Sequence, residues 1–284
     1  MTKKPTSTLI RLTGKAGACR RSFQKACPER SRRVAGVDGC RAGWFVVIAS
    51  VAKYLGPQFI GGFPYIYKLR DSFVARTFAE ALSKTTDCKL VCVDIPIGLS
   101  NGDKPRQCDI AARKILGKGR ASSVFPPPIR SCLPAKDLQI ASEICFKHSG
   151  KKLNRQSFFI MDKIRQVDDL MKSRLQQCVR EIHPELVFWA LNGKKPMQHN
   201  KKTLTGRNER MKLLSLIFSD VAELVAKARN PKDVEPDDIL DALAAAWTAG
   251  QIVLGKAETL PKNPELDSKG LRMEILYPIA IIDN

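Results

Sequence analysis

Two short apolar runs of this chain each close on an aspartate. Asp38 ends the run in VAGVDG, and Asp94 ends the run in KLVCVDIP. Burying a lone carboxylate is costly, so acids in such positions need a partner. Later in the chain, Asp238 and Asp241 lie three residues apart in PDDILDALAAAWTA, on one face of an expected helix. The chain must therefore fold so that these carboxylates find partners, and divalent metal ions are the usual partners of such a cluster.

The order of apolar runs and turn signals predicts an α/β fold. Strands are expected over 33–38, 43–51, 58–63, 89–95, 179–183 and 273–277, and helices over 73–83, 108–116, 135–146, 159–178, 185–191, 208–228 and 236–254. Asp71 or Ser72 is expected to cap the first of these helices. A meander of three strands, followed by helix, strand and further helices, predicts a mixed five-stranded sheet with helices on both faces.

Composition divides the chain into parts. Residues 1–33 carry ten Lys and Arg residues against one acid and show no periodicity, so a basic, disordered tail is expected there. A transit peptide, a translated repeat around CPERSRR and a phosphate-contacting arm stay open as interpretations of that tail. Residues 34–284 are expected to form one domain, with an insertion at about 117–178 that contains the Pro-rich run SSVFPPP. The net charge of +20 favours an anionic partner such as nucleic acid.

Several classes of protein are disfavoured. The 284 residues contain no run of eighteen apolar residues, so no membrane span is expected. The nine cysteines form no CxxC pair, which favours reduced thiols and a cytoplasmic location. Three histidines are too few for a His-rich zinc site. The absence of a GxxxxGK[ST] loop argues against a phosphotransferase or ATPase.

A set of motifs spans the body of the chain from about residue 34 to 278: VAGVDGCRAGW, VCVDIPIGL, RQCDIAARKILG, SSVFPPP, LNRQSFFIMDKIRQVDDL, REIHPELVFWALNG, KKTLTGRNER, DDILDALAAAWTA and LRMEILYP. Together they resemble a bacterial and archaeal domain-of-unknown-function family of predicted nucleases with an RNase H-like fold. The DDxxDA pattern is also similar to the closing helix of RuvC-type resolvases. The resemblance implies that Asp38, Asp94, Asp238 and Asp241 bind metal ions, Mg²⁺ or Mn²⁺. Gln166 departs from the family, which usually has an acid at that position.

The chemistry expected of this set is two-metal hydrolysis of a phosphodiester, with carboxylates holding both ions. Glu181 is a further catalytic candidate beside the last strand, with an Arg partner as the alternative. Glu185 and Asp237 have a simpler interpretation as acids at helix starts. His183 is either a general base or a packed structural histidine. Candidate substrate-binding residues, each also explicable as ordinary surface charge, are Arg41, Arg120, Lys201, Lys202 and Arg207.

The leading hypothesis is therefore a metal-dependent nuclease that hydrolyses phosphodiester bonds in nucleic acid. The alternative is a catalytically silent nucleic-acid- or partner-binding module on the same fold. The large Pro-rich insertion motivates this alternative, because it would be able to cap the active face.

Overall fold

A central sheet organises the protein, and the computed structural model describes residues 32–53, 65–230 and 232–279. The sheet has five strands in the order β3-β2-β1-β4-β5. Strands β1, β2 and β3 are antiparallel neighbours, whereas β4 and β5 run parallel to β1. This mixed order is RNase H-like, as the sequence predicted. The strands are β1 (Arg33–Cys40), β2 (Gly43–Lys53), β3 (Tyr65–Ala75), β4 (Leu90–Val93) and β5 (Val179–Glu181).

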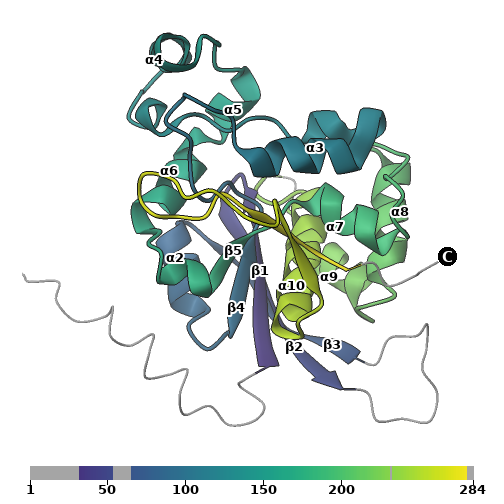
Figure 1. Ribbon diagram of the computed structural model, residues 1–284. Helices are drawn as coiled ribbons and strands as arrows, with labels where there is room; N and C mark the ends of the chain where they lie inside the picture. The colour runs from purple at the N-terminus through teal and green to yellow at the C-terminus, as the bar shows by residue number, and fades with distance from the viewer. Residues whose placement is uncertain (1–31, 54–64, 231, 280–284) are drawn as a thin grey trace, which may run out of the picture.

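Helices cover both faces of the sheet (Figure 1). Alternation along β1 explains this, because successive side chains of a strand point to opposite faces. Val34 packs in the cluster that contains α7, α8 and α10, whereas Ala35 and Val37 pack with α2 and α6. The helices are α2 (Phe78–Lys84), α3 (Gln107–Arg120), α4 (Leu138–Ser149), α5 (Arg155–Phe159), α6 (Met161–Leu170), α7 (Pro184–Leu191), α8 (Leu204–Leu214), α9 (Val221–Ala228) and α10 (Pro236–Val253).

Helix α10 lies directly against β1, and Gly36 makes this approach possible. A Cβ atom added at Gly36 would lie 2.0 Å from the Ala242 carbonyl oxygen and 2.2 Å from the Ala246 nitrogen. The alanines of α10 provide a flat surface on the other side of the contact. This close packing sets the distance between the acids of β1 and those of α10.

Two expectations about the first half of the chain need correction. The strand expected over 58–63 lies outside the described residues, and β3 begins at Tyr65. Asp71 and Ser72 do not cap a helix, because both lie inside β3 and pair with β2. Thr77 caps α2 instead, with its side chain accepting a hydrogen bond from the Glu80 N–H at 3.2 Å.

The second half also differs in detail from the prediction. The helix expected over 208–228 is two helices, α8 and α9, because Ile217 and Phe218 turn into the core between them. The helix expected over 159–178 ends at Leu170 in α6. The final strand is β7 (Ile275–Pro278), and it pairs with β6 (Ala257–Leu260), which was not predicted.

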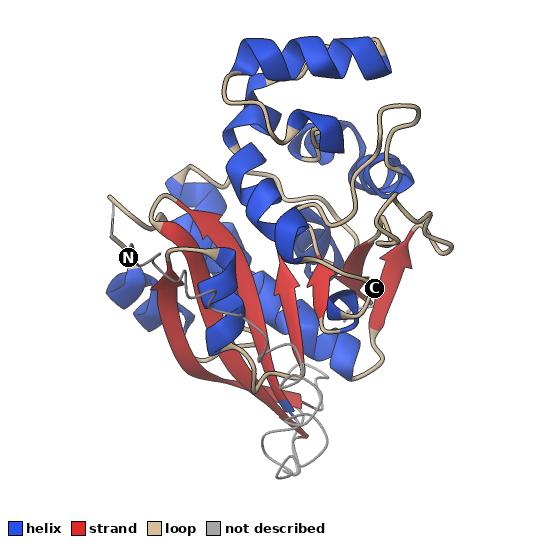
Figure 2. Ribbon diagram, turned by 90° about the vertical axis from the view of Figure 1, so that its left-hand side faces the viewer, coloured by secondary structure: helices blue, strands red, loops and turns tan. Residues whose placement is uncertain are grey.

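The helices α3, α4 and α5 lie beyond one end of the sheet (Figures 1 and 2). Gly117 interrupts α3 with a φ of 63°, a conformation that glycine adopts without strain. The chain then makes two short 3₁₀ turns, Ala121–Ser123 and Arg130–Cys132, on either side of the proline run. No helix in the described ranges is long and apolar enough to cross a membrane.

Candidate active site

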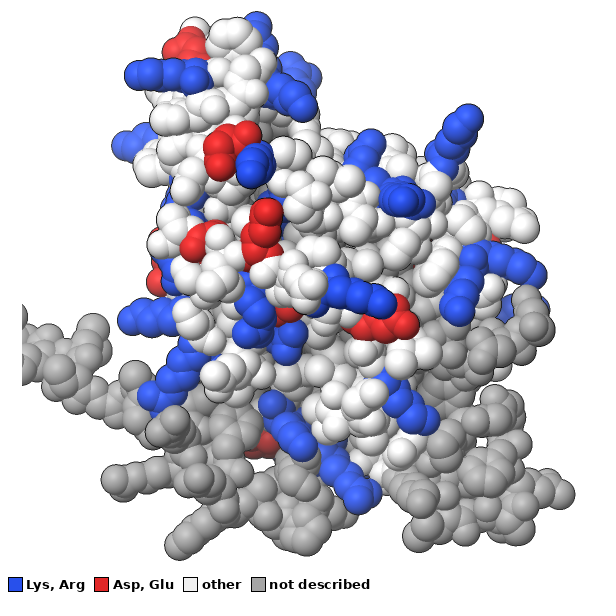
Figure 3. Space-filling model, in the orientation of Figure 1, with Lys and Arg blue, Asp and Glu red and all other residues white. Residues whose placement is uncertain are grey.

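A cavity of about 530 Å³ opens at the end of the sheet where β1 and β4 finish. Its floor comes from Asp38, Asp94 and the first turns of α10, and its opposite wall comes from the segments around Ser123 and Gln156. The segments around Ser123 and Gln156 therefore lie across the cavity from the acids. Lys and Arg side chains are spread over the surface seen in Figure 3 and do not gather into one stripe there.

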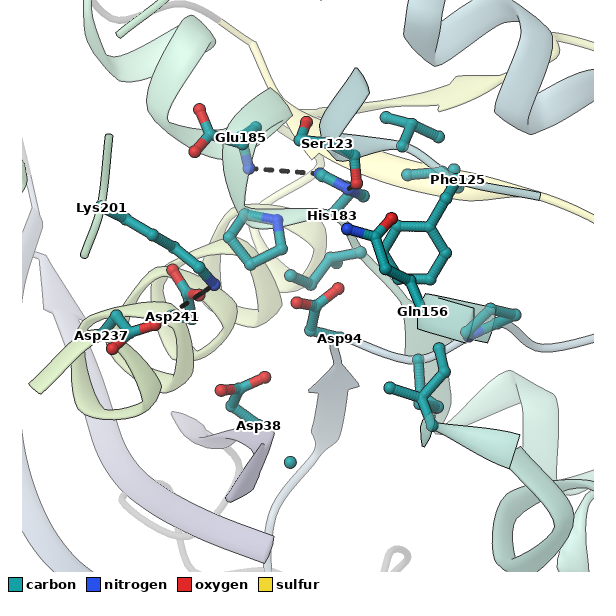
Figure 4. Close-up of a pocket in the computed structure, with 18 of the residues that line it drawn as sticks. Asp38, Asp94, Ser123, Phe125, Gln156, His183, Glu185, Lys201, Asp237 and Asp241 are labelled. Atoms are coloured by element: carbon teal, nitrogen blue, oxygen red, sulfur yellow. Dashed lines mark hydrogen bonds and ion pairs between the residues drawn. The ribbon is translucent and has the colours of Figure 1, made fainter. Parts of the chain in front are cut away.

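Three carboxylates from distant parts of the chain meet in this cavity. Asp38 lies near the end of β1, Asp94 directly follows β4, and Asp241 lies on α10 (Figure 4). Burial raises the pKa of Asp38 well above its usual range, and the carboxylates of Asp241 and Asp94 raise it further. Burial also raises the pKa of Asp94 to about 6, although His183 opposes this shift. The structure thus brings Asp38, Asp94 and Asp241 together in one cavity.

Asp38 and Asp94 share an unusual property. Within the described ranges, neither carboxylate accepts a hydrogen bond or takes part in an ion pair with a protein group, although Asp38 is only 7% exposed. Buried carboxylates normally have partners, because desolvating a charge is expensive. Their oxygens face the cavity, so a cation or a proton has to supply the missing stabilisation.

Asp241 differs because it has a cationic partner. The Lys201 ammonium lies 2.5 Å from Asp241 Oδ2 and 3.7 Å from Asp237 Oδ2. Lys202 lies 2.8 Å from Asp237 Oδ2. Burial of the Lys201 ammonium lowers its pKa, but Asp241 and Asp38 outweigh this and raise the pKa well above its usual range. Both lysines thus face carboxylates of the cavity, and their expected role in substrate binding stays a prediction.

Asp238 has a role at the start of α10. Its Oδ2 accepts a hydrogen bond from the Glu235 N–H at 2.8 Å, as one half of a capping box. Burial raises its pKa to about 6, against the lowering effect of that hydrogen bond. Asp238 still lines the cavity, but one of its oxygens is committed to the helix terminus.

Glu181 has the Arg partner that the sequence left open. Arg106 is buried and lies 2.5 Å from Glu181 Oε2, which also accepts the Ile97 N–H at 2.6 Å. Burial raises the pKa of Glu181 to about 8 despite Arg106. These contacts hold Glu181 at the edge of the cavity and make it a structural neighbour of Asp94.

Of the three arginines expected to bind substrate, one lines the cavity and two do not. Arg120 lines the cavity, donates from Nε to the Met197 carbonyl at 2.8 Å and lies 4.0 Å from Glu185. Arg41 and Arg207 are not among the residues that line the cavity. Arg207 lies on α8 and donates back to the Thr203 carbonyl at 3.4 Å.

His183 is held by both ring nitrogens. Nδ1 accepts the Glu185 N–H at 3.3 Å, so the hydrogen-bond network assigns the ring proton to Nε2, which donates to the Ser123 carbonyl at 3.3 Å. The imidazole caps α7 and joins it to the turn Ala121–Ser123, which fits the structural interpretation of this residue.

Sequence reasoning undervalued Glu185. Its Oε1 accepts a hydrogen bond from Arg210 at 2.5 Å, whereas Oε2 is buried without a hydrogen bond. Glu185 is near enough to raise the pKa values of Asp94 and Asp241. Its place in the sequence, directly after a proline at a helix start, gave no sign of this burial.

Gln166 lies outside the cavity lining. Its Oε1 accepts hydrogen bonds from Trp44 Nε1 and the Phe78 N–H, both at 3.0 Å. The residue joins α6, β2 and α2, which is a structural task. In the part of the chain that the structure describes, no three Asp, Glu, His or Cys side chains are grouped so as to hold a metal ion by themselves.

The strand order and helix placement define an RNase H-like α/β protein. The chain belongs to the family described as "Protein of unknown function (DUF429)", which matches residues 36–266. Among solved structures, the Thermus thermophilus RuvC structure is similar, with 13% sequence identity and a TM-score of 0.31. That match covers 78% of this chain and 95% of the RuvC chain. No curated protein shows significant sequence similarity to the chain.

Proposed function

We propose that this protein is a metal-dependent hydrolase that cleaves phosphodiester bonds in nucleic acid. One observation carries the proposal: Asp38 and Asp94 end neighbouring parallel strands, face the same cavity and have no protein partner among the described residues. Two charged groups in that position destabilise the folded protein unless a ligand compensates them.

The residues fit a divalent cation of the Mg²⁺ type. Mg²⁺ and Mn²⁺ take hard oxygen ligands, and Mg²⁺ is commonly bound through one or two carboxylates with water and substrate phosphate completing its shell. Asp38 and Asp94 would supply the carboxylates. When bound, the ion would supply Lewis acidity at a phosphate oxygen and lower the pKa of a coordinated water.

The protein's own groups would position the substrate and exclude bulk water. Arg120 and residues 122–125 also line the cavity, and a phosphate group would enter beside them. The chain carries a formal charge of +20, and its long-range electrostatic field favours the approach of a polyanion. The insertion above the cavity would restrict access to an extended or single-stranded segment.

The test is metal-dependent cleavage of labelled single- and double-stranded DNA and RNA oligonucleotides by the full chain. Asp38→Asn and Asp94→Asn should each lower the rate about 100-fold or more, since removal of a metal ligand forfeits several kcal/mol of transition-state stabilisation. Asp162→Asn is the matched control, because the Asp162 side chain is 81% exposed on α6.

Unchanged cleavage by Asp38→Asn would refute the proposed site. Salt-sensitive binding of an oligonucleotide without any metal-dependent cleavage would instead support the catalytically silent binding module.

A further inference from the structure

Lys201 places a positive charge inside the carboxylate cluster. Its ammonium lies 2.5 Å from Asp241 Oδ2 and 3.7 Å from Asp237 Oδ2, and Asp241 is only 1% exposed. Figure 4 shows the lysine side chain reaching Asp241 from the side of the cavity away from Asp94. The ammonium thus forms direct ion pairs with Asp241 and Asp237, whereas its charge acts on Asp38 and Asp94 only at longer range.

The segment that carries Lys201 is fixed by its own contacts. Glu209 accepts the backbone N–H groups of Gln198 at 2.9 Å and His199 at 3.1 Å. Gly206 packs so tightly on this segment that an added Cβ would lie 2.0 Å from the Asn200 carbonyl oxygen. The backbone beside the lysine is therefore held in place by groups outside the carboxylate cluster. The ammonium is a built-in part of the site.

Two other acids near the cavity have cations of their own. Lys202 lies 2.8 Å from Asp237, and the buried Arg210 lies 2.5 Å from Glu185. Each carboxylate thus has a cation in direct contact that offsets part of its charge, although Glu185 still raises the pKa values of Asp94 and Asp241.

The remaining charges match one divalent ion. Asp38, Asp94 and Asp241 carry three negative charges when ionised, and Lys201 compensates one of them. Among these four groups the excess is two negative charges, which a single Mg²⁺ or Mn²⁺ would balance. A second divalent ion near Asp241 would have to approach the Lys201 ammonium, and like charges a few Å apart in a partly buried site repel strongly. Asp238 also lines the cavity, but its Oδ2 accepts the Glu235 N–H, so it offers only its other oxygen to a second ion.

We propose that the Lys201 ammonium takes the place of a second metal ion at the Asp237–Asp241 end of the cluster, so that this centre binds one divalent cation, at Asp38 and Asp94. The inference rests on the proposed function and replaces the two-ion arrangement expected from the sequence. Lys201 then acts as a positioning residue: it fixes Asp241 and keeps its charge beside the bound ion without contacting the reacting atoms.

The number of Mn²⁺ ions bound per chain tests this directly, measured by equilibrium titration with electron paramagnetic resonance of free Mn²⁺. The wild-type full chain should bind one ion. Lys201→Met should bind a second ion, because Asp241 loses its cation. Lys201→Gln provides a second neutral variant with a polar end group, in case Lys201→Met fails to fold. Lys201→Arg keeps the charge and should bind one ion.

Lys202→Met is the matched control, because it removes a neighbouring charge that contacts Asp237 and not Asp241. It should leave the count at one. Two ions on the wild type, both lost in Asp38→Asn, would overturn the inference while supporting the metal centre. A count that stays at one in both folded neutral Lys201 variants would also overturn it. No Mn²⁺ binding to the wild type would refute the proposed function itself.

Discussion

Replacing Gly36 with alanine tests how the fold sets the site. Gly36 is buried in β1, and the new Cβ would lie 2.0 Å from the Ala242 carbonyl oxygen, 2.2 Å from the Ala246 nitrogen and 2.8 Å from the Ala245 carbonyl carbon. Ordinary contact between heavy atoms needs about 3.5 Å, so α10 would have to retreat by roughly 1.5 Å. All three obstructing atoms belong to helix backbone, which cannot move aside as a flexible side chain can.

The expected cost lies at the upper end of the range for overpacking, about 3 kcal/mol. For a domain of this size that corresponds to a fall in Tm of about 6–12 °C, measurable by calorimetry or circular dichroism. Because the same retreat would carry Asp241 away from Asp38, the Mn²⁺ affinity of the folded variant should fall as well. Stability and metal binding should therefore change together.

Gly119→Ala is the control, since a Cβ there meets nothing within 4 Å. Alanine in a helix should leave the Tm unchanged or raise it, by up to about 1 kcal/mol of added stability. The reasoning would be refuted if Gly36→Ala unfolded within 0–2 °C of the wild type, a shift of about 0.5 kcal/mol or less, since β1 and α10 would then not be in close contact.

Three further predictions concern buried polar groups. Arg106→Met should destabilise the fold by about 3–5 kcal/mol in urea denaturation, because it leaves Glu181 buried without its cation; adding Glu181→Leu should recover much of the loss, and no recovery would count against the pairing. Burial raises the pKa of Asp94 to about 6, so its contribution to stability is fully present below about pH 4 and is lost as the pH rises through 6. The Tm of metal-free protein should therefore fall between about pH 4 and 6. An equal fall in Asp94→Asn would exclude this carboxyl as its source. Gln166→Leu should lower the free energy of unfolding by about 1–3 kcal/mol for each N–H group that it leaves unpaired. One of these groups is Trp44 Nε1, so a shift in tryptophan fluorescence gives an independent signal.

Most of the sheet was predictable because its signals are local. The runs that form β1, β2, β4 and β5 are short, apolar and bounded by turn residues, and each was expected within a few residues of its place. The helix start was predicted too early because Asp71 and Ser72 look like helix caps in the sequence, whereas both lie in β3. Their pairing with β2, more than twenty residues earlier, overrides that local preference.

The sequence by itself determined which acids end apolar strands and which lie on an apolar helix, and hence that Asp38, Asp94 and Asp241 needed partners. Only the tertiary structure decided which of them have one. Lys201 is 40 residues from Asp241 in the chain, and Arg106 is 75 residues from Glu181. Periodicity and turn chemistry act over a few residues, whereas the partner of a buried charge is chosen by distance in space. That choice leaves Asp38 and Asp94 as the two carboxylates that face the cavity unpaired within the described part of the chain.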